Sequence, residues 1–174
     1  EKAKQNSPLA VHAALPLVGD DADRALVERV AKLPIQGVVF DVAFAEDTPR
    51  LAEFIARVRP LLTVPVAAKL DRPDVALLVA LHRAGCDAIW TNTATQLTLD
   101  GLALTVGAAA EPPRALAIDV FDVAHKEKIG ERLAPGCDCF ACTRHTLAYV
   151  HHLLRCNELT GRVLLSVHNH RLLH

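Results

Sequence analysis

Residues 37–70 read GVVFDVAFAEDTPRLAEFIARVRPLLTVPVAAKL and alternate between two patterns. The first is a continuous run of apolar, β-branched and aromatic residues from Gly37 to Val42, which is typical of a buried strand. A helix then opens at Thr48-Pro49, carries apolar residues along one side, and ends at Pro60. A second strand-like run follows at residues 64–70. This alternation predicts a parallel sheet with helices packed outside it.

The same alternation extends in both directions from this stretch. On the N-terminal side, a short apolar run at residues 11–17 precedes a helix that Asp21 can cap. On the C-terminal side, Asp71-Arg72-Pro73 opens a helix that Gly85 stops, and residues 87–91 form a fourth strand. Four such strands are half of a closed eight-stranded barrel, and a doubly wound open sheet is the alternative.

Composition limits the class of protein. The chain has 174 residues, of which 51% are hydrophobic, and a net charge of −1, which excludes a disordered tail and a strongly basic nucleic-acid binder, although not a local basic patch. No apolar run approaches the roughly 20 residues of a membrane helix. The chain contains no methionine, which indicates a piece of a longer protein, and its polar first residues, 1–8, are expected to fray.

The five cysteines are an odd number, and three of them fall close together in GCDCFACTRH, residues 136–145. This clustering suits a metal better than disulfides and predicts a reducing, cytoplasmic location, with association with an organelle surface or the nucleus left open. The thiolates of Cys137, Cys139 and Cys142 can converge on one tetrahedral zinc ion. A cluster of free thiols and an iron–sulfur site are the alternatives.

A closed structural zinc site needs a fourth ligand from the protein. The candidates are the histidines that follow the cysteines: His145, His151, His152, His168, His170 and His174. His145 follows Cys142 too closely to turn back, and His151 and His152 lie within a helix predicted over residues 143–159. His168 follows that helix and a strand-like run at residues 163–167, so it can return to the site. His168 is therefore preferred, and His170 and His174 stay open.

The stretch CDCFACTRHTLAYVHHLLRCNELTGRVLLSVHNHR, residues 137–171, closely resembles the zinc-binding region of the tRNA-guanine transglycosylase family. It matches the family's C-x-C-x2-C motif, its A-Y-x-H-H-L helix, its N-E pair and its terminal H-N pair. The resemblance implies one structural zinc ion per chain, held by Cys137, Cys139, Cys142 and His168. It also implies the fold class: an α/β chain forming the C-terminal half of a (β/α)8 TIM-like barrel, with an inserted zinc-binding subdomain.

The expected organisation has three ordered parts after the frayed residues 1–8. Residues 9–107 form the half-barrel of βα units. Residues 108–124, which begin in the Ala/Pro-rich sequence GAAAEPPRAL, form a linker or insert. Residues 125–174 form the zinc-binding subdomain and the closing helix.

A second segment, GCDAIWTNTATQLTLDGLALTV at residues 85–106, resembles the part of the family that carries the catalytic nucleophile. In this alignment, Trp90 stands at the position of the nucleophilic aspartate. Residues 92–94 stand at the family's P-T-R and contain no arginine, while Asp41 and Val42 replace paired glycines of the base-binding loop. The reaction needs a carboxylate that attacks the ribose as guanine leaves, and an indole cannot do this. We therefore expect no catalytic residue, and we expect Trp90 to fill the vacated base pocket.

With these substitutions, the chain resembles the non-catalytic branch of the family. The resemblance implies a heterodimer with a catalytic queuine tRNA-ribosyltransferase subunit, in which this chain supports exchange of guanine for queuine at the wobble position of tRNA. No activity of the chain alone is expected. An active homodimeric transglycosylase and a zinc-stabilised scaffold without a tRNA role are the alternatives.

Two surfaces are candidates for these partners, and each also has a plainer interpretation. The candidate tRNA contacts are Lys126, Lys128, Arg132 and Arg144, which otherwise form a solvated face. The candidate dimer interface is Tyr149, His151 and His152, which otherwise pack against the barrel.

Overall fold

The computed structural model describes residues 12–16, 21–42, 48–71, 74–107 and 114–174. The chain divides into two compact units, Glu1–Thr91 and Asn92–His174. The division therefore falls directly after the fourth strand of the first unit.

The first unit contains one sheet of four parallel strands in the order β1-β2-β3-β4. The strands are β1 (His12–Pro16), β2 (Gly37–Val42), β3 (Val66–Leu70) and β4 (Ala88–Thr91). Each was predicted from an apolar run, and the parallel pairing follows from the helical crossovers between the strands. The predicted strand-helix alternation is confirmed.

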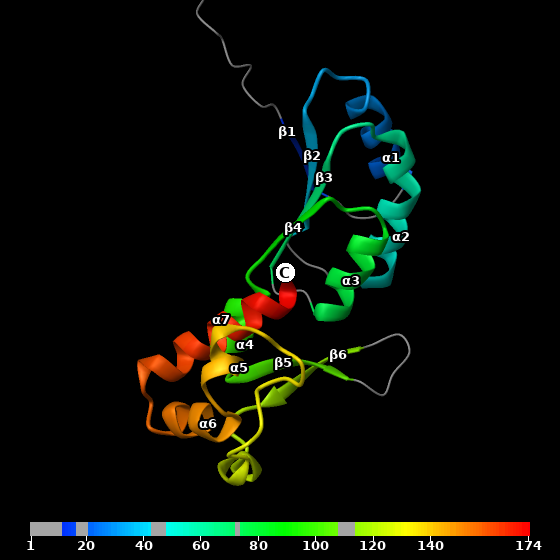
Figure 1. Ribbon diagram of the computed structural model, residues 1–174. Coiled ribbons are helices and arrows are strands. Elements are labelled where there is room, and N and C mark those ends of the chain that lie inside the picture. The colour runs from blue at the N-terminus through cyan, green and yellow to red at the C-terminus, as the bar shows by residue number, and fades with distance from the viewer. Residues whose placement is uncertain (1–11, 17–20, 43–47, 72–73, 108–113) are drawn as a thin grey trace, which may run out of the picture. The chain divides into compact units, whose positions relative to one another are not determined.

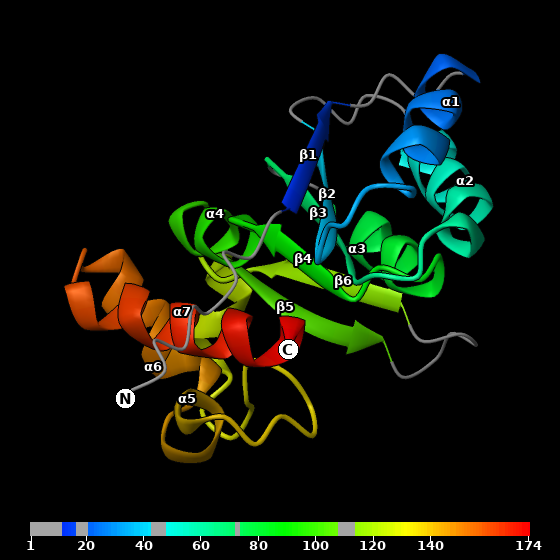
Figure 2. The same cartoon turned by 90° about the horizontal axis from the view of Figure 1, so that it is seen from above.

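Three crossover helices lie along one face of this sheet, as both ribbon views show (Figures 1 and 2). They are α1 (Asp21–Val30), α2 (Thr48–Val58) and α3 (Val75–Arg83), with a short 3-10 turn, η1 (Arg59–Leu61), after α2. Phe40 of β2 and Phe54 of α2 meet edge to face, with ring centroids 6.4 Å apart, in the buried core between sheet and helices. The opposite face of the sheet carries more exposed residues, such as Lys69 and Trp90.

Helix α3 begins and ends at local signals. The side chain of Asp74 accepts a hydrogen bond from the backbone N–H of Leu77 at 2.7 Å, which caps the first turn. After the C-cap, Gly85 has a φ of 96°, a conformation that side-chain-bearing residues rarely adopt. The predicted stop at Gly85 is confirmed.

In its described residues, the second unit combines two antiparallel strands with four helices. Its elements are α4 (Thr93–Leu99), β5 (Leu102–Gly107), β6 (Arg114–Asp119), the 3-10 turn η2 (Val123–Glu127), α5 (Phe140–Arg144), α6 (Leu147–Arg155) and α7 (Leu159–Leu173). Helix α7 packs against α4, β5, α5 and α6 (Figure 2). It is therefore the element that joins the parts of this unit, and Leu165 on it is fully buried.

Residues 114–119, within the predicted linker or insert over 108–124, form β6. Two other predictions for this unit were wrong in their secondary structure. Residues 163–167 lie inside α7 rather than in a strand, because Leu164, Leu165, His168 and Asn169 are buried at helical spacing. The helix expected over 143–159 is divided: residues 143–144 end α5, α6 covers Leu147–Arg155, and residue 159 begins α7. The side chain of Thr146 caps α6 by accepting from the Tyr149 N–H.

A glycine permits the close crossing of α6 and α7. A Cβ built on Gly161 would lie 2.9 Å from the Cβ of Leu153 and 3.0 Å from the backbone nitrogen of Leu154. Any side chain at this position would force the two helices apart. The crossing matters for the metal ligands because His168 lies two turns further along α7.

Candidate metal centre

The structure brings together the four predicted ligands, Cys137, Cys139, Cys142 and His168, all of them buried. Their ligand atoms lie within 4.8 Å of one another. The Nδ1 atom of His168 is 3.6 Å from the Sγ of Cys137, 3.7 Å from that of Cys139 and 3.3 Å from that of Cys142. These separations suit four atoms arranged around one central ion, and three sulfurs with one imidazole nitrogen form a common tetrahedral donor set for zinc.

Local structure turns the cysteines inward. Cys139 precedes the first turn of α5, and its Sγ accepts a hydrogen bond from the backbone N–H of Cys142 at 3.3 Å. This turn brings Cys142 back towards Cys139 across the intervening two residues. The guanidinium of Arg132 donates to the carbonyl of Cys137 at 3.2 Å and so fixes the chain where it enters the motif.

His168 is held from its other side by strand β5. Its Nε2 lies 2.7 Å from the carbonyl oxygen of Leu104, so Nε2 carries the proton and donates it. Nδ1 is then unprotonated, and its lone pair faces the three sulfurs. Burial also lowers the pKa of His168, which favours the neutral ring that a metal requires. Metal-binding histidines typically donate such a hydrogen bond from their other ring nitrogen, which fixes the orientation of the ring.

The three thiols are in an environment that opposes their ionisation without a cation. Burial, together with the neighbouring sulfurs of Cys139 and Cys137, raises the pKa of Cys142 to about 12. Burial also raises the pKa of Cys137. A divalent ion offsets this cost because thiolates bind it directly, so the geometry and the charge balance both fit a metal. The site has four protein ligands and therefore suits a structural role.

The residue after His168 has a role that the sequence did not reveal. Asn169 is fully buried, and its Oδ1 accepts from the backbone N–H of Leu104 at 2.9 Å. Its Nδ2 donates to the carbonyl of Leu102 at 2.9 Å and to the hydroxyl of Thr98 at 3.2 Å. The His-Asn pair therefore fixes both the metal ligand and the edge of β5 through the same residue, Leu104.

The position aligned with the catalytic nucleophile lies in the first unit. Trp90 on β4 is in register with Lys69 on β3, which is in register with Asp41 on β2. Lys69 and Asp41 form an ion pair of 3.0 Å. Trp90 is 53% exposed in this chain, and its place in the base pocket stays a prediction. This row of side chains offers no free carboxylate next to Trp90.

Asp87, the nearest carboxylate in sequence to Trp90, is committed to structural contacts. Its Oδ2 accepts from the backbone N–H of Val66 at 2.8 Å and pairs with Arg59 at 3.3 Å. Arg59 also donates to the carbonyl of Gly85 at 2.9 Å. These bonds tie the start of β4 to β3 and to η1, which gives Asp87 a role in the fold.

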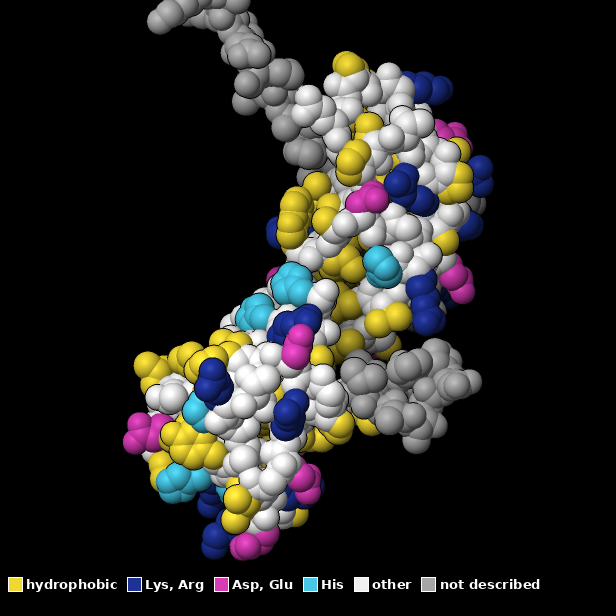
Figure 3. All heavy atoms as spheres, in the orientation of Figure 1, with side chains coloured by type: hydrophobic (Ala, Val, Ile, Leu, Met, Phe, Trp, Pro, Cys, Tyr) yellow, Lys and Arg dark blue, Asp and Glu magenta, His cyan; other side chains and the backbone are white. Residues whose placement is uncertain are grey.

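The predicted tRNA contacts are surface residues with different surroundings. Lys126, Arg132 and Arg144 are exposed, whereas Lys128 is partly buried and pairs with Glu131 at 3.5 Å. On the visible face of the molecule, lysine and arginine side chains lie in separate groups, several of them beside acidic ones (Figure 3). Binding of tRNA by these residues stays a prediction.

The predicted dimer interface needs one correction. His151 is only 6% exposed, and its Nδ1 lies 2.7 Å from the carbonyl of Val120, so it belongs to the interior of its own unit. Tyr149 and His152 are exposed. The helix turns successive side chains by about 100°, which separates neighbouring His151 and His152. Of the three predicted residues, Tyr149 and His152 are therefore the ones exposed to a partner.

Comparison with known proteins identifies relatives of the chain. Residues 14–174 match the family model described as queuine tRNA-ribosyltransferase. Queuine tRNA-ribosyltransferase accessory subunit 2 of Drosophila mojavensis is 40% identical over 94 residues, which are 53% of this chain and 22% of that protein. The protein of the same name from Ixodes scapularis is 33% identical over 124 residues, covering 71% of this chain and 30% of the relative.

A relative with another name matches over a shorter stretch. The queuine tRNA-ribosyltransferase of Gluconacetobacter diazotrophicus is 62% identical over 37 residues, which are 21% of this chain and 10% of that protein. The chain thus covers less than a third of the length of these relatives. None of the helices in the part of the chain that the structure describes combines the length and apolar character needed to cross a bilayer. The match to the family model covers most of the sequence, and the chain belongs to the queuine tRNA-ribosyltransferase family.

Proposed function

We propose that this chain is part of a non-catalytic subunit of a heterodimeric queuine tRNA-ribosyltransferase. It would support the exchange of guanine for queuine at the wobble position of tRNA, in the cytoplasm, by dimerisation and tRNA binding. The observation that carries the proposal is Trp90, an indole at the position aligned with the nucleophilic carboxylate, beside an ion pair of Lys69 and Asp41. The names of the accessory-subunit relatives agree with it.

The first unit would be the C-terminal half of a (β/α)8 barrel. Four parallel strands with their helices on one face support this, because a barrel carries all its helices outside, whereas a doubly wound sheet carries them on both faces. The second unit would be the zinc-binding subdomain, with zinc as the ion held by Cys137, Cys139, Cys142 and His168. Zinc is favoured because it prefers this tetrahedral sulfur and nitrogen donor set.

The surface for the catalytic partner would be the aromatic row on α5 and α6. Phe140 and His145 pack with their ring centroids 5.8 Å apart, and His145 stacks on Tyr149 at 5.1 Å. Phe140 is 60% exposed and Tyr149 43% exposed. Exposed rings already ordered by stacking lose little entropy on binding, and aromatic residues are enriched at protein interfaces.

The direct test is a base-exchange assay with labelled guanine and tRNA. We expect no exchange by this subunit alone, and we expect it to co-purify with the catalytic subunit and raise the exchange rate of the mixture. If Tyr149 is a hot spot of this interface, Tyr149→Ala should lower recovery of the complex, because truncating a hot-spot residue costs at least about 2 kcal/mol, or roughly 30-fold in affinity. Arg155→Ala, which changes an exposed residue on the same helix, is the matched control.

A further variant tests whether the chain lacks only the nucleophile or also the other residues that the reaction needs. Trp90→Asp supplies a carboxylate but leaves Lys69 and Asp41 paired and adds no base-binding glycines, so it should stay inactive alone. Exchange by the unmodified chain alone would favour an active homodimer instead. Absence of any complex with the catalytic subunit would leave only the scaffold interpretation.

Binding of tRNA can be tested through its salt dependence. If the four predicted cations Lys126, Lys128, Arg132 and Arg144 contact phosphates, a plot of log affinity against log salt should have a slope of roughly −3. Lys126→Gln should reduce that slope by about 1, whereas Lys32→Gln, an exposed lysine of the first unit, should leave it unchanged. Affinity independent of salt, measured by fluorescence anisotropy, would contradict phosphate binding.

A further inference from the structure

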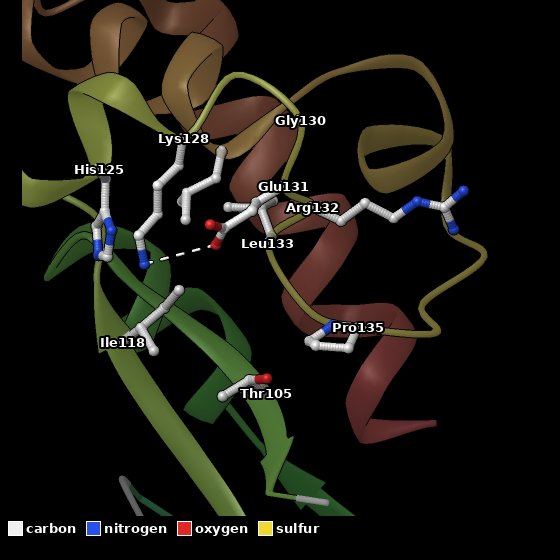
Figure 4. A pocket seen from close by; sticks show the side chains of 10 residues that line it. Thr105, Ile118, His125, Lys128, Gly130, Glu131, Arg132, Leu133 and Pro135 are labelled. Atoms are coloured by element: carbon white, nitrogen blue, oxygen red, sulfur yellow. Dashed lines mark ion pairs between the residues drawn. The ribbon is translucent and has the colours of Figure 1, made fainter.

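The second unit contains a cavity of about 450 Å³ between β5, β6 and the loop that leads to the cysteines (Figure 4). This volume lies within the range of small-molecule sites. Its wall is apolar at Ile118, Leu133 and Leu147, and polar at His125 and Lys128. The proposed function above uses two residues of the wall, Lys128 and Arg132, as phosphate contacts but assigns nothing to the cavity itself, which is distinct from the metal site and from the aromatic row.

His125 leaves a polar atom unsatisfied at the edge of this cavity. The residue is 8% exposed, and its buried Nδ1 has no hydrogen-bond partner within the described ranges of the chain. Buried polar atoms in folded proteins are almost always hydrogen-bonded, so each exception indicates a missing partner. In Figure 4 the His125 ring borders the cavity beside the ammonium group of Lys128.

The 3-10 turn explains why these two side chains converge. Residues three apart in such a turn lie on the same side, because it has three residues per turn. The backbone N–H of Lys128 donates to the carbonyl of His125 at 3.1 Å, which closes this turn. The Lys128 ammonium makes a long ion pair of 3.5 Å with Glu131, whose side chain is 60% exposed. Lys128 therefore has donors left for another acceptor.

We propose that this cavity binds a small organic anion. Its carboxylate or phosphate group accepts hydrogen bonds from His125 Nδ1–H and from the Lys128 ammonium, and its apolar body lies against Ile118, Leu133 and Leu147. The anion competes with Glu131 for Lys128. Arg132 also lines the cavity, but its side chain extends away and its guanidinium donates to the Cys137 carbonyl (Figure 4).

The test is a titration of the zinc-loaded chain followed through the histidine ring nitrogens by NMR, with His125→Gln used to assign the His125 signals. The probes are benzoate, phenyl phosphate and neutral benzamide, each up to about 10 mM, which fills a site whose Kd is near 1 mM. We expect a saturable change at His125 with at least one anion and none with benzamide. The stronger of the two anions identifies the head group as carboxylate or phosphate.

Two variants with opposite expected signs make the test decisive. Lys128→Met should weaken anion binding roughly ten-fold by removing a charged hydrogen bond. Glu131→Gln should strengthen it about three-fold by removing the competing carboxylate. Arg144→Met, outside the cavity, should change neither. No change at His125 with either anion, equal binding of benzamide, or weaker anion binding by Glu131→Gln would each overturn the proposal.

Discussion

Replacing Cys139 with alanine is expected to release the zinc ion and to unfold the second unit. Removing one ligand leaves two buried sulfurs and His168 around an incomplete site. Structural zinc contributes on the order of 10 kcal/mol in small zinc-binding peptides, which is comparable to the whole stability of an ordinary domain. Native mass spectrometry should find one zinc per chain before the change and none after it. Hydrogen exchange at α7 should become fast.

Cys156→Ala is the matched control for this experiment. Cys156 is an exposed free cysteine in the same unit and is not part of the cluster. Its replacement should leave the zinc content unchanged and alter stability by less than about 0.5 kcal/mol. Full stability of the Cys139→Ala chain without metal would refute a structural role for zinc and return the site to the interpretation of a buried thiol cluster.

The elements that could be predicted are those whose type and ends are set by residues close together in the sequence. The strands of the first unit are short apolar runs between helices with clear starts and stops, such as Pro60 and Gly85. The cysteine spacing predicted the metal cluster, and its fourth ligand, His168, was selected with help from the family resemblance. The four residues do lie within metal-binding distance.

The errors arose where tertiary packing outweighs local pattern. Helix α7 buries Leu164 and Leu165 but also carries apolar residues, Val163 and Val167, on its exposed side, so the sequence of this run shows no helical period. Helix α4 was missed because it is rich in threonine, a poor helix former. Its buried Thr98 donates to the carbonyl of Ala94 at 2.8 Å, and the helix is held by packing on α7.

The roles of Asn169 and His125 could not be read from the sequence for a different reason. Asn169 forms hydrogen bonds with Leu102 and Leu104, which lie far away along the chain. The Nδ1 of His125 has no hydrogen-bond partner within the part of the chain described. A sequence motif can mark such a residue, as the H-N pair did, but the bonded atoms become known only from the structure.

Asn169→Leu is expected to produce the second-largest loss of stability. Leucine has a similar size but cannot pair with the N–H of Leu104 or the carbonyl of Leu102, which would remain buried without partners. Each unsatisfied buried group costs about 1–3 kcal/mol, so the free energy of unfolding should fall by about 4 kcal/mol. Chemical denaturation followed by circular dichroism measures this change. His170→Ala, on an exposed neighbour, should cost less than about 0.5 kcal/mol.

The coupling between Asn169 and the metal can be measured through the zinc affinity of the Asn169→Leu chain. Leu104 donates its N–H to Asn169 and accepts a hydrogen bond from the metal ligand His168, so both interactions hold the same part of β5. When two residues share a partner, the effects of changing them on the free energy do not add, and the coupling energy is about 0.5–3 kcal/mol. Asn169→Leu should therefore weaken zinc binding, which competition with a chelator measures, whereas His170→Ala should not. Unchanged zinc affinity in Asn169→Leu would show that the metal site and the β5 contact are independent.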